Sequence, residues 1–316
     1  MAEISVIIPI FKAGNYLSRC LDSISRQSFR DFEVILIDDG SPDNSGTICD
    51  EYVKRDNRFK VVHKENGGVS SARAIGVEMA KGKYSIQFDP DDWVEEDMLQ
   101  LLHDKAEYDR SDIVVCDMYM HYDSTLKIVS HKKRPNSTDL LFDEFLTGRF
   151  PASLANKLIR HGLYKEKHFI FNPEVTRWED TQTVCTLMYG LDRISFVDKP
   201  LYHYDFHSNP NSLARNTNMS GLRSQITVCD YFFKLLQGTT HEAAVDSMRM
   251  STKALAYNVL NSVDYSELYS QFNKKVLKQG VSGQLGISGF FMALTILTHC
   301  DIPQYIYKKL QGIRGK

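Results

Sequence analysis

The chain has 316 residues, of which 42% are hydrophobic and 25% charged, and its formal net charge is −2. This composition is that of a globular protein with room for a large domain and a smaller one, and the near-neutral charge argues against a nucleic-acid binder that depends on neutralising phosphates. The six cysteines are scattered without a CxxC pair, so we expect buried thiols and neither a disulfide framework nor a zinc site.

The first 88 residues alternate between two hydrophobic periods. Short β-branched runs are typical of strands buried on both faces, and the segments between them show helical spacing. We predict strands at 4–11, 32–38, 59–64 and 84–88, separated by helices at 15–29, 45–56 and 70–82. This repetition predicts an α/β fold with a mainly parallel sheet, whose ligands bind beyond the carboxyl ends of its strands.

The pattern loosens after Asp112. We expect a strand at 112–120, a polar loop at 131–139, helical segments at 153–167, a loop entering a helix at 177–190, and a strand with a turn at 194–206. From about Gly221 the chain is mostly helical, and 222–236 is an amphipathic helix candidate.

Notable residues follow each of the first four predicted strands. They are Phe11 and Lys12, Asp38 and Asp39, Asn66, and the acidic cluster that begins at Asp89. Because the carboxyl ends of parallel strands meet at one edge of a sheet, we expect these side chains to share a site.

The stretch FDPDDWVEED crowds carboxylates at the end of the fourth strand. Asp92 could be a helix N-cap with Glu95 at the third helical position. That interpretation leaves Asp89 and Asp91 unexplained. Two carboxylates one residue apart in a turn can face one hard cation such as Mg²⁺ or Mn²⁺, although the spacing alone leaves both interpretations open.

Two turn-rich stretches could contact a nucleotide. In IDDGSPDNS, Asp38 and Asp39 are either part of a strand-to-helix turn or acceptors for a base N–H or a ribose hydroxyl. In ENGGVSSARAIG, Gly67 and Gly68 allow a ligand to approach the backbone closely, and Arg73 could reach a diphosphate or remain solvated.

In RWEDTQT, Glu179 and Asp180 adjoin Trp178 just before a predicted helix. Asp180 is either an N-cap or a carboxylate held beside an aromatic wall, the setting that a general base needs.

The stretch YHYDFHSNPNSLAR adds His203, His207, Ser212 and Arg215. Lone histidines are usually structural, and we keep His203 and His207 only as alternatives for a third metal ligand.

In chain order, VIIPIF, DFEVILIDDGSPDNS, NGGVSSARAIGVEMAKGKYSIQFDPDD and WED resemble the family 2 glycosyltransferases. The resemblance covers roughly the first two-thirds of the chain, and its motifs are specific when taken jointly. It implies the GT-A fold, a Rossmann-like sheet flanked by helices, and inverting transfer of a sugar from a nucleotide donor. UDP is favoured over GDP and dTDP. Within the family, the sequence looks most like bacterial enzymes that extend capsular, exopolysaccharide or lipopolysaccharide glycans.

The resemblance also implies roles for donor-binding residues. The implied set is Pro9, Phe11, Asp38, Asp39, Asn66, Gly68, Ala72, Arg73 and Asp89. Phe11 would lie on the base ring, Asp39 would accept from a uracil N–H, and Arg73 would lie near the diphosphate. Three positions depart from the family pattern: Phe11 stands where tyrosine is usual, and Lys12 and Ala74 stand where asparagine is usual. These replacements could alter donor affinity or choice, but none of them removes a charge that the chemistry needs.

For the chemistry, the resemblance implies Asp91 as the direct ligand of Mn²⁺ or Mg²⁺, with Asp89 as a second ligand or on the ribose. Asp180 falls on the family's catalytic base, with Glu179 beside it. Such a metal offsets charge on the leaving nucleotide, and the base takes the proton from the attacking hydroxyl.

We predict a glycosyltransferase domain at 1–218, with a nucleotide-sugar half at about 1–112 and an acceptor half at about 113–218, and a helical region at 219–316. The expected acceptor is a glycan or a lipid-linked saccharide, and a homo-oligomer is compatible with the sequence. A sugar-nucleotide nucleotidyltransferase is a rival, but PIFKAGNY lacks its glycine- and arginine-rich loop. A non-catalytic glycan-assembly subunit is another, which the carboxylates argue against.

The C-terminal stretch YIYKKLQGIRGK is aromatic and basic through Tyr305, Tyr307, Lys308, Lys309, Arg314 and Lys316. It could rest on an anionic bilayer or form a solvated helix. The apolar stretch at 287–300 is too short to span a bilayer, and the N-terminus lacks signal-peptide features. We therefore expect a cytoplasmic protein, either free or peripheral on the inner face of the cell membrane.

Overall fold

The computed structural model of the chain describes residues 2–206, 218–282 and 286–314. Outside the described residues lie His207, Ser212, Arg215 and Lys316, and also the side chains of Lys309 and Arg314. The chain divides into two compact units, Met1–Arg215 and Asn216–Lys316, which are taken separately below. The domain boundary at 218 stays a prediction.

The N-terminal unit contains a nine-stranded sheet in its described part. Its strands are β1 Ile4–Ile10, β2 Phe32–Asp38, β3 Phe59–His63, β4 Tyr84–Gln87, β5 Trp93–Val94, β6 Ile113–His121, β7 Leu126–Val129, β8 Lys157–Arg160 and β9 Ile194–Asp205. They are ordered β3-β2-β1-β4-β8-β6-β9-β5, and β7 pairs with β6 outside this path.

The α/β sheet is confirmed, although it is fully parallel only in its first half. Strands β3, β2, β1 and β4 are parallel to one another, and β6 is parallel to β9. Strands β8, β5 and β7 are antiparallel to their partners. Parallel β1, β2 and β4 bring the loops after them to one edge, where the predicted site residues lie.

The prediction of helical segments at 153–167 is wrong for its middle part, which forms β8 before the short helix α6 Leu163–Glu166. Leu158 and Ile159 are both buried, because β8 lies between β4 and β6 and needs apolar side chains on both faces. Such a strand lacks the alternation that marks a half-exposed one.

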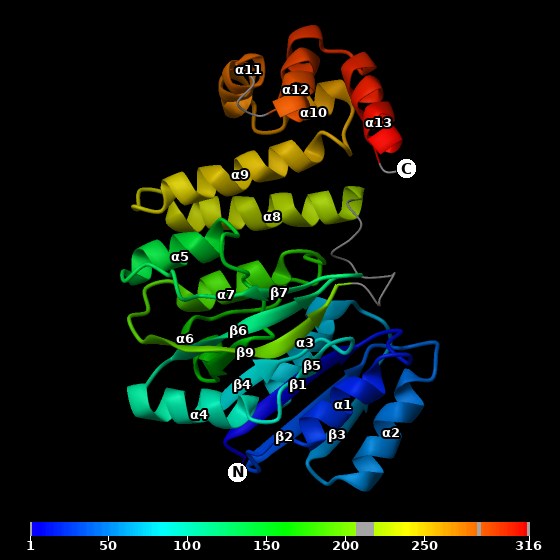
Figure 1. The fold of residues 1–316 in the computed structure, drawn as a ribbon, viewed down its shortest axis with the longest axis vertical. Coiled ribbons are helices and arrows are strands. Elements are labelled where there is room, and N and C mark those ends of the chain that lie inside the picture. The colour runs from blue at the N-terminus through cyan, green and yellow to red at the C-terminus, as the bar shows by residue number, and fades with distance from the viewer. Residues whose placement is uncertain (1, 207–217, 283–285, 315–316) are drawn as a thin grey trace. The chain divides into compact units, whose positions relative to one another are not determined.

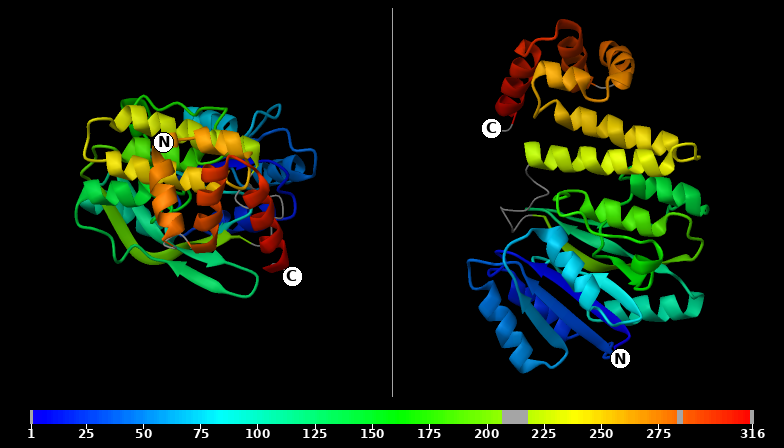
Figure 2. Two further views of the ribbon diagram at one scale, coloured as in Figure 1. Left: turned by 90° about the horizontal axis from the view of Figure 1, so that it is seen from above. Right: turned by 180° about the vertical axis from the view of Figure 1, so that it is seen from behind.

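Helices cover both faces of the parallel half. Helices α1 Leu17–Ser25, α2 Ser45–Arg55 and α4 Met98–Asp109 contribute to one apolar cluster with β1, while α3 Val69–Met79 packs on the opposite face against β1 and β2. Figure 1 shows α1 and α2 in front of the strands, and the view from behind in Figure 2 shows α3. A Cβ at Gly76 would lie 2.3 Å from Ile7 Cγ2, so this close approach of α3 requires glycine.

Two more helices complete the described part of the N-terminal unit, α5 Thr138–Leu146 and α7 Glu179–Met188. All six cysteines are free; five are buried and Cys300 is partly exposed. Five of the six thiols therefore lie in the protein interior, as predicted, and Cys300 is the exception.

The C-terminal unit is helical throughout its described residues. Its elements are α8 Met219–Leu236, α9 Glu242–Ala256, α10 Ser262–Glu267, the 3₁₀ helix η1 Ser270–Phe272, α11 Asn273–Val281, α12 Gly286–Thr298 and α13 Ile302–Arg314. Helices α8 and α9 lie side by side (Figure 1), and a core around Tyr257 and Tyr265 joins α8 to the later helices. Within the described residues, none of the helices combines the length and apolarity needed to cross a membrane.

Candidate active site

The loop after β1 presents an aromatic ring to solvent. Phe11 is 45% exposed, and the Lys12 ammonium lies 5.1 Å from the centre of its ring. The Lys12 backbone N–H donates to Ser41 Oγ (3.3 Å), which ties this loop to the turn after β2. Pro9 is buried within β1 and paired with Ile37. Phe11 thus offers a stacking face, whereas Pro9 supports the strand beneath it.

Asp39 is 2% exposed, and residues of the loop after β3 donate to both oxygens of its carboxylate. The oxygens accept hydrogen bonds from Asn66 Nδ2 (3.2 Å) and from the backbone N–H groups of Gly67 (2.9 Å) and Gly68 (2.8 Å), and they pair with the Lys64 ammonium. Gly68 has a φ of 84°, which favours glycine. Four donors occupy the acceptor sites of one carboxylate, so contact with a uracil N–H stays a prediction and requires a partner to move.

Asp38 braces the turn that follows β2. It accepts from the Ser41 backbone N–H (3.0 Å), and its other oxygen lies 2.8 Å from His63 Nδ1. Burial favours a higher pKa for Asp38, but the hydrogen bonds from His63 and Ser41 lower the pKa below its usual value. His63 Nε2 lies 3.2 Å from Asp50 Oδ1, so the same cluster joins β2, β3 and α2.

The acidic turn after β4 divides its carboxylates between two environments. Asp92 is 1% exposed and accepts from Tyr202 Oη (2.5 Å) and the Asp205 backbone N–H (2.7 Å). Burial raises the pKa of Asp92 well above its usual value. Helix α4 begins only at Met98, so the N-cap interpretation of Asp92 is wrong. The carboxylate of Asp92 instead accepts hydrogen bonds from residues of strand β9. Asp89 is partly exposed instead.

Arg73 lies at the centre of a carboxylate cluster and is 2% exposed. Its Nη2 lies 3.1 Å from Asp89 Oδ1, 3.2 Å from Asp180 Oδ1 and 3.9 Å from Glu179 Oε1. Its Nη1 donates to Gln87 Oε1 (2.9 Å). The guanidinium predicted near a diphosphate therefore joins the end of β4 to the start of α7. It brings together two motifs that are far apart in the sequence.

This cluster is rich in negative charge. Burial raises the pKa of Asp89 to about 7. Arg73 opposes this change, whereas the negative charges of Asp180 and Asp91 add to it. Burial and the adjacent Asp180 raise the pKa of Glu179 to about 8, although Arg73 opposes the change. The raised pKa values indicate that these carboxyls carry more negative charge than Arg73 alone offsets, so a further cation would be stabilised here.

The turn at Asp89 and Asp91 fits a divalent metal. Both aspartates are partly exposed, and they flank Pro90 at the carboxyl end of β4. The Arg19 guanidinium donates to the Asp91 backbone oxygen (2.6 Å) and pairs with Asp205 (2.8 Å), which fixes the turn. Hard carboxylate oxygens in an excess of negative charge suit Mg²⁺ or Mn²⁺.

Asp180 lies in the first turn of α7. The helix begins at Glu179, and its N-cap is Trp178, which has a φ of 66°. The N-cap interpretation of Asp180 is therefore wrong, and its Oδ2 instead accepts from the Leu154 backbone N–H (3.1 Å). One oxygen of Asp180 faces Arg73 and the other faces the loop before β8.

Lys157 organises that loop, and its role was missed in the sequence. It is fully buried, and its Nζ donates to the carbonyl oxygens of Pro151 (3.0 Å) and Ser153 (2.7 Å) and to Asn156 Oδ1 (2.8 Å). Burial lowers the pKa of Lys157 to about 7, against the opposing charge of Asp180. A lysine in the run NKLI looks like an exposed residue, so the sequence carries no signal of this role.

Ala72 is placed differently from the prediction. It is fully buried and packs against Ile35 and Ile37, because it lies on the side of α3 that faces the sheet. Ala72 therefore contributes to the core and does not line a donor pocket.

The metal-ligand alternative for His203 is also not supported. Its Nδ1 lies 3.0 Å from His121 Nε2, and its Nε2 lies 2.9 Å from Glu95 Oε1. Its ring stacks on Trp93 with 4.9 Å between centroids. Both ring nitrogens are thus used within an aromatic stack between β5, β6 and β9.

Two other features lie outside this cluster. Glu3, His103 and Glu107 bring three ligand atoms within 4.8 Å of one another, but Glu107 already accepts from Lys83 and Tyr84.

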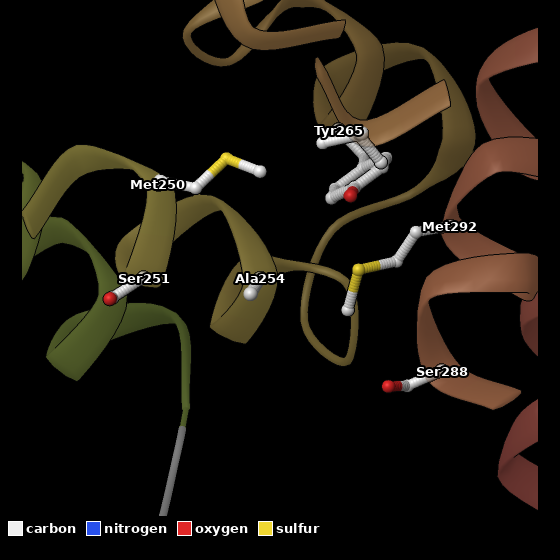
Figure 3. A pocket seen from close by; sticks show the side chains of 7 residues that line it. Met250, Ser251, Ala254, Tyr265, Ser288 and Met292 are labelled. Atoms are coloured by element: carbon white, nitrogen blue, oxygen red, sulfur yellow. The ribbon is translucent and has the colours of Figure 1, made fainter. Parts of the chain in front are cut away.

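A cavity of about 240 Å³ lies within the C-terminal unit (Figure 3). It is lined by Met250, Ser251, Ala254, Tyr265, Val276, Ser288 and Met292. No predicted site residue lines it.

Comparison with known proteins decides the family. Residues 5–170 match the family described as glycosyl transferase family 2, a range that includes the acidic turn at Asp89 and Asp91 and ends before α7 and β9. This chain is a family 2 glycosyltransferase. The predicted resemblance is therefore confirmed, together with the GT-A fold that it implied.

Relatives of this family 2 glycosyltransferase include the uncharacterized glycosyltransferase EpsJ of Bacillus subtilis. EpsJ is 34% identical over 217 residues, which are 66% of this chain and 62% of EpsJ. The aligned part thus spans less than two thirds of that relative.

Solved structures share the fold at low identity. TarS of S. aureus, residues 1–349 in complex with UDP, gives a TM-score of 0.64 at 19% identity and covers 98% of this chain and 92% of that one. The mannosyltransferase PcManGT of Pyrobaculum calidifontis, in complex with GDP-Man and Mn²⁺, gives 0.57 at 13% identity, covering 96% and 86%. These likenesses extend over both units of the glycosyltransferase.

Proposed function

We propose that this glycosyltransferase moves a sugar, with inversion, from a UDP-sugar to a hydroxyl of a glycan or a lipid-linked saccharide. Asp180 is the general base, with Glu179 beside it, and Asp91 and Asp89 hold Mn²⁺ or Mg²⁺. The reaction would extend a bacterial surface polysaccharide, and the enzyme would work in the cytoplasm or against the inner face of the membrane. Family membership supports the reaction class, and the contacts of Arg73, Asp180 and the acidic turn support the finer assignments.

The observation that carries this proposal is the convergence on Arg73. One buried guanidinium pairs with Asp89, which follows β4, and with Asp180 and Glu179, which begin α7. A transferase needs its leaving-group side and its base within the reach of one sugar ring. Ion pairs to a shared cation keep these carboxylates close together, which supports roles in a single site.

The environment of Asp180 suits a general base. The Leu154 N–H donates to one oxygen of Asp180, and the Arg73 guanidinium lies beside the other, so the carboxylate is held in place. Burial and the neighbouring Asp180 raise the pKa of Glu179 to about 8, which limits the negative charge beside Asp180. Asp180 can then accept a proton from a hydroxyl that attacks C1 in line with the leaving group.

The leaving-group side depends on the turn at Asp89 and Asp91. When bound there, a divalent cation supplies Lewis-acid stabilisation of charge on the departing nucleoside diphosphate. Arg19 holds the backbone of this turn, and the pairing of Asp89 with Arg73 orients one carboxylate. The complex of PcManGT with GDP-Man and Mn²⁺ supports this assignment by analogy of fold.

The donor side offers the exposed Phe11 ring for the base, and we assign Asp38, Asp39, Asn66 and Gly68 to the same binding site. We assign the base as uracil because TarS, a structure of the same fold, holds UDP. Uracil entry would displace the Lys64 ammonium from Asp39, since a lysine side chain moves more readily than the backbone N–H donors.

The test is a screen of UDP-, GDP- and dTDP-sugars with Mn²⁺ or Mg²⁺, read as nucleoside diphosphate release and as protection against thermal unfolding. We expect metal-dependent release of UDP and loss of metal-dependent donor binding in Asp91→Ala. Pyrophosphate release would favour a nucleotidyltransferase. Neither binding nor turnover of any donor would favour a non-catalytic assembly subunit.

A further inference from the structure

The last helix of the chain turns a row of large apolar side chains towards solvent. In α13, Ile302, Tyr305, Ile306 and Leu310 are each between 43% and 65% exposed. Their spacing of three, four and eight residues from Ile302 places them on one side of the helix. Apolar residues at this spacing ordinarily face a core, and an exposed row of them is typical of a helix that binds another surface.

The opposite side of α13 fixes this orientation. Gln304 is 4% exposed, and its Nε2 donates to the carbonyl oxygens of Tyr257 (3.2 Å) and Leu260 (3.1 Å). The Tyr307 ring packs against that of Tyr257 at 5.5 Å between centroids. The helix therefore cannot rotate to bury its apolar row without breaking these contacts.

Helix α12 adds a second exposed row. Phe290 and Leu297 are 50% and 60% exposed, and seven residues apart they lie on the same side of that helix. We call the four exposed residues of α13 the C-terminal apolar face: Ile302, Tyr305, Ile306 and Leu310.

Charge distinguishes this segment from the rest of the chain. Residues 302–316 contain four basic residues and no acidic one, whereas the whole chain has 38 basic and 40 acidic residues. The basic residues are Lys308, Lys309, Arg314 and Lys316. A helix that combines an apolar side with a sequence rich in Lys and Arg is the pattern of helices that lie in the interface of an anionic bilayer.

We propose that the C-terminal apolar face binds the surface of a bilayer containing anionic lipids. Helix α13 has 13 residues, short of the roughly 20 needed to span, so it lies in the plane of the interface. A second copy of the chain is the less favoured occupant, since a symmetric contact would oppose the same basic residues. The proposal rests on the proposed function only in giving the enzyme access to lipid-linked acceptors, because binding itself needs neither donor nor acceptor.

The test is flotation of the full-length protein with phosphatidylcholine vesicles, with and without phosphatidylglycerol, in the absence of donor. We expect binding that is stronger with phosphatidylglycerol and weakened by salt. Ile302→Ser combined with Ile306→Ser should reduce the affinity at least about tenfold. Lys308→Gln should reduce it about fivefold on anionic vesicles only.

The matched control is Val263→Ser, which removes a 53% exposed apolar side chain from α10 in the same unit, outside the face. It should bind as the wild type does. Each change is at an exposed position, and thermal unfolding verifies that the fold is kept.

Wild-type protein that does not bind anionic vesicles overturns the proposal, as does a double variant whose affinity for them is unchanged. Concentration-dependent dimers lost in the double variant, without vesicle binding, would assign the face to a second copy. UDP release from a soluble donor is read separately, so a failure of this proposal leaves the transferase assignment standing.

Discussion

At the scale of single residues, Arg73 decides how the acidic groups behave. A buried guanidinium with three carboxylates around it is not a solvated helix residue, and removing it would leave buried negative charge without compensation. The raised pKa values of Asp89, about 7, and Glu179, about 8, show that this compensation is already incomplete.

Arg73→Met should therefore destabilise the protein in a pH-dependent way. We expect a loss of about 3–5 kcal/mol in the free energy of unfolding at pH 8.5 and a smaller loss at pH 5.5, with a chelator present. A carboxyl whose pKa is raised by folding stabilises the native state below its unfolded pKa, and this stabilisation is lost as pH rises through the folded pKa. Removing Arg73 raises both folded values further and deepens the loss at high pH.

Urea unfolding at the two pH values measures the effect, and Arg26→Met is the control. Arg26 lies 3.7 Å from Glu96 in an exposed pair, so this change should cost less than about 1 kcal/mol at either pH. An equal loss at both pH values for Arg73→Met would show that the carboxylates do not sense its charge.

Residue-level patterns predicted this site unevenly. The strand-end pattern singled out Asp89 and Asp91 as candidates and the family resemblance singled out Asp180, and the roles of all three stay predictions. Their meeting at Arg73 depends on how far apart the ends of β4 and α7 lie in space, which spacing along the chain does not encode. Ala72 was misplaced because adjacent helical positions point in directions about 100° apart, towards the sheet for one residue and towards the carboxylates for the next.

At the scale of elements, the loop before β8 connects Lys157 to the predicted base. Three acceptors surround the buried ammonium, and the loop that they belong to carries the Leu154 N–H that binds Asp180. Lys157 contacts no reacting group and is in this view a positioning residue.

Lys157→Met should lower kcat by about ten- to hundredfold while KM for the donor stays within about twofold, because a small displacement of the base misaligns proton transfer. Steady-state kinetics with a saturating acceptor separate the two constants. Lys83→Met, which removes an exposed lysine paired with Glu107, should change neither. A raised donor KM at unchanged kcat would place the influence of Lys157 on the donor side instead.

Elements were predicted well where period and length agree. The β-branched runs of β1 and β2 and the helical spacing of α1 and α2 gave the parallel half correctly. Strand β8 was missed because four residues buried on both faces show neither period, and two-residue β5 has no pattern at all. The hydrogen bonds that occupy the Asp39 carboxylate could likewise not be predicted from the sequence, because they depend on a loop conformation with Gly68 at positive φ.

At the scale of the whole molecule, the two compact units predict two thermal transitions. Saturating UDP with Mn²⁺ should raise the Tm of one transition by about 5–10 °C and leave the other within about 1 °C, because the proposed donor site lies entirely in the N-terminal unit. Differential scanning calorimetry of the full chain measures both.

Val245→Ala identifies the transition that should not respond. Val245 is 1% exposed in α9, so the substitution should lower the Tm of the C-terminal transition alone. If UDP and Mn²⁺ shift the transition that Val245→Ala lowers, the donor binds elsewhere than proposed.

The general-base role of Asp180 is tested most directly by the transfer rate of Asp180→Asn, measured beside its affinity for UDP with Mn²⁺ by isothermal titration. We predict that transfer falls by about 10²–10⁴ while the affinity stays within about twofold, because Asn keeps the size of the side chain but cannot take the proton. Equal transfer rates for variant and wild type would contradict the role assigned to Asp180.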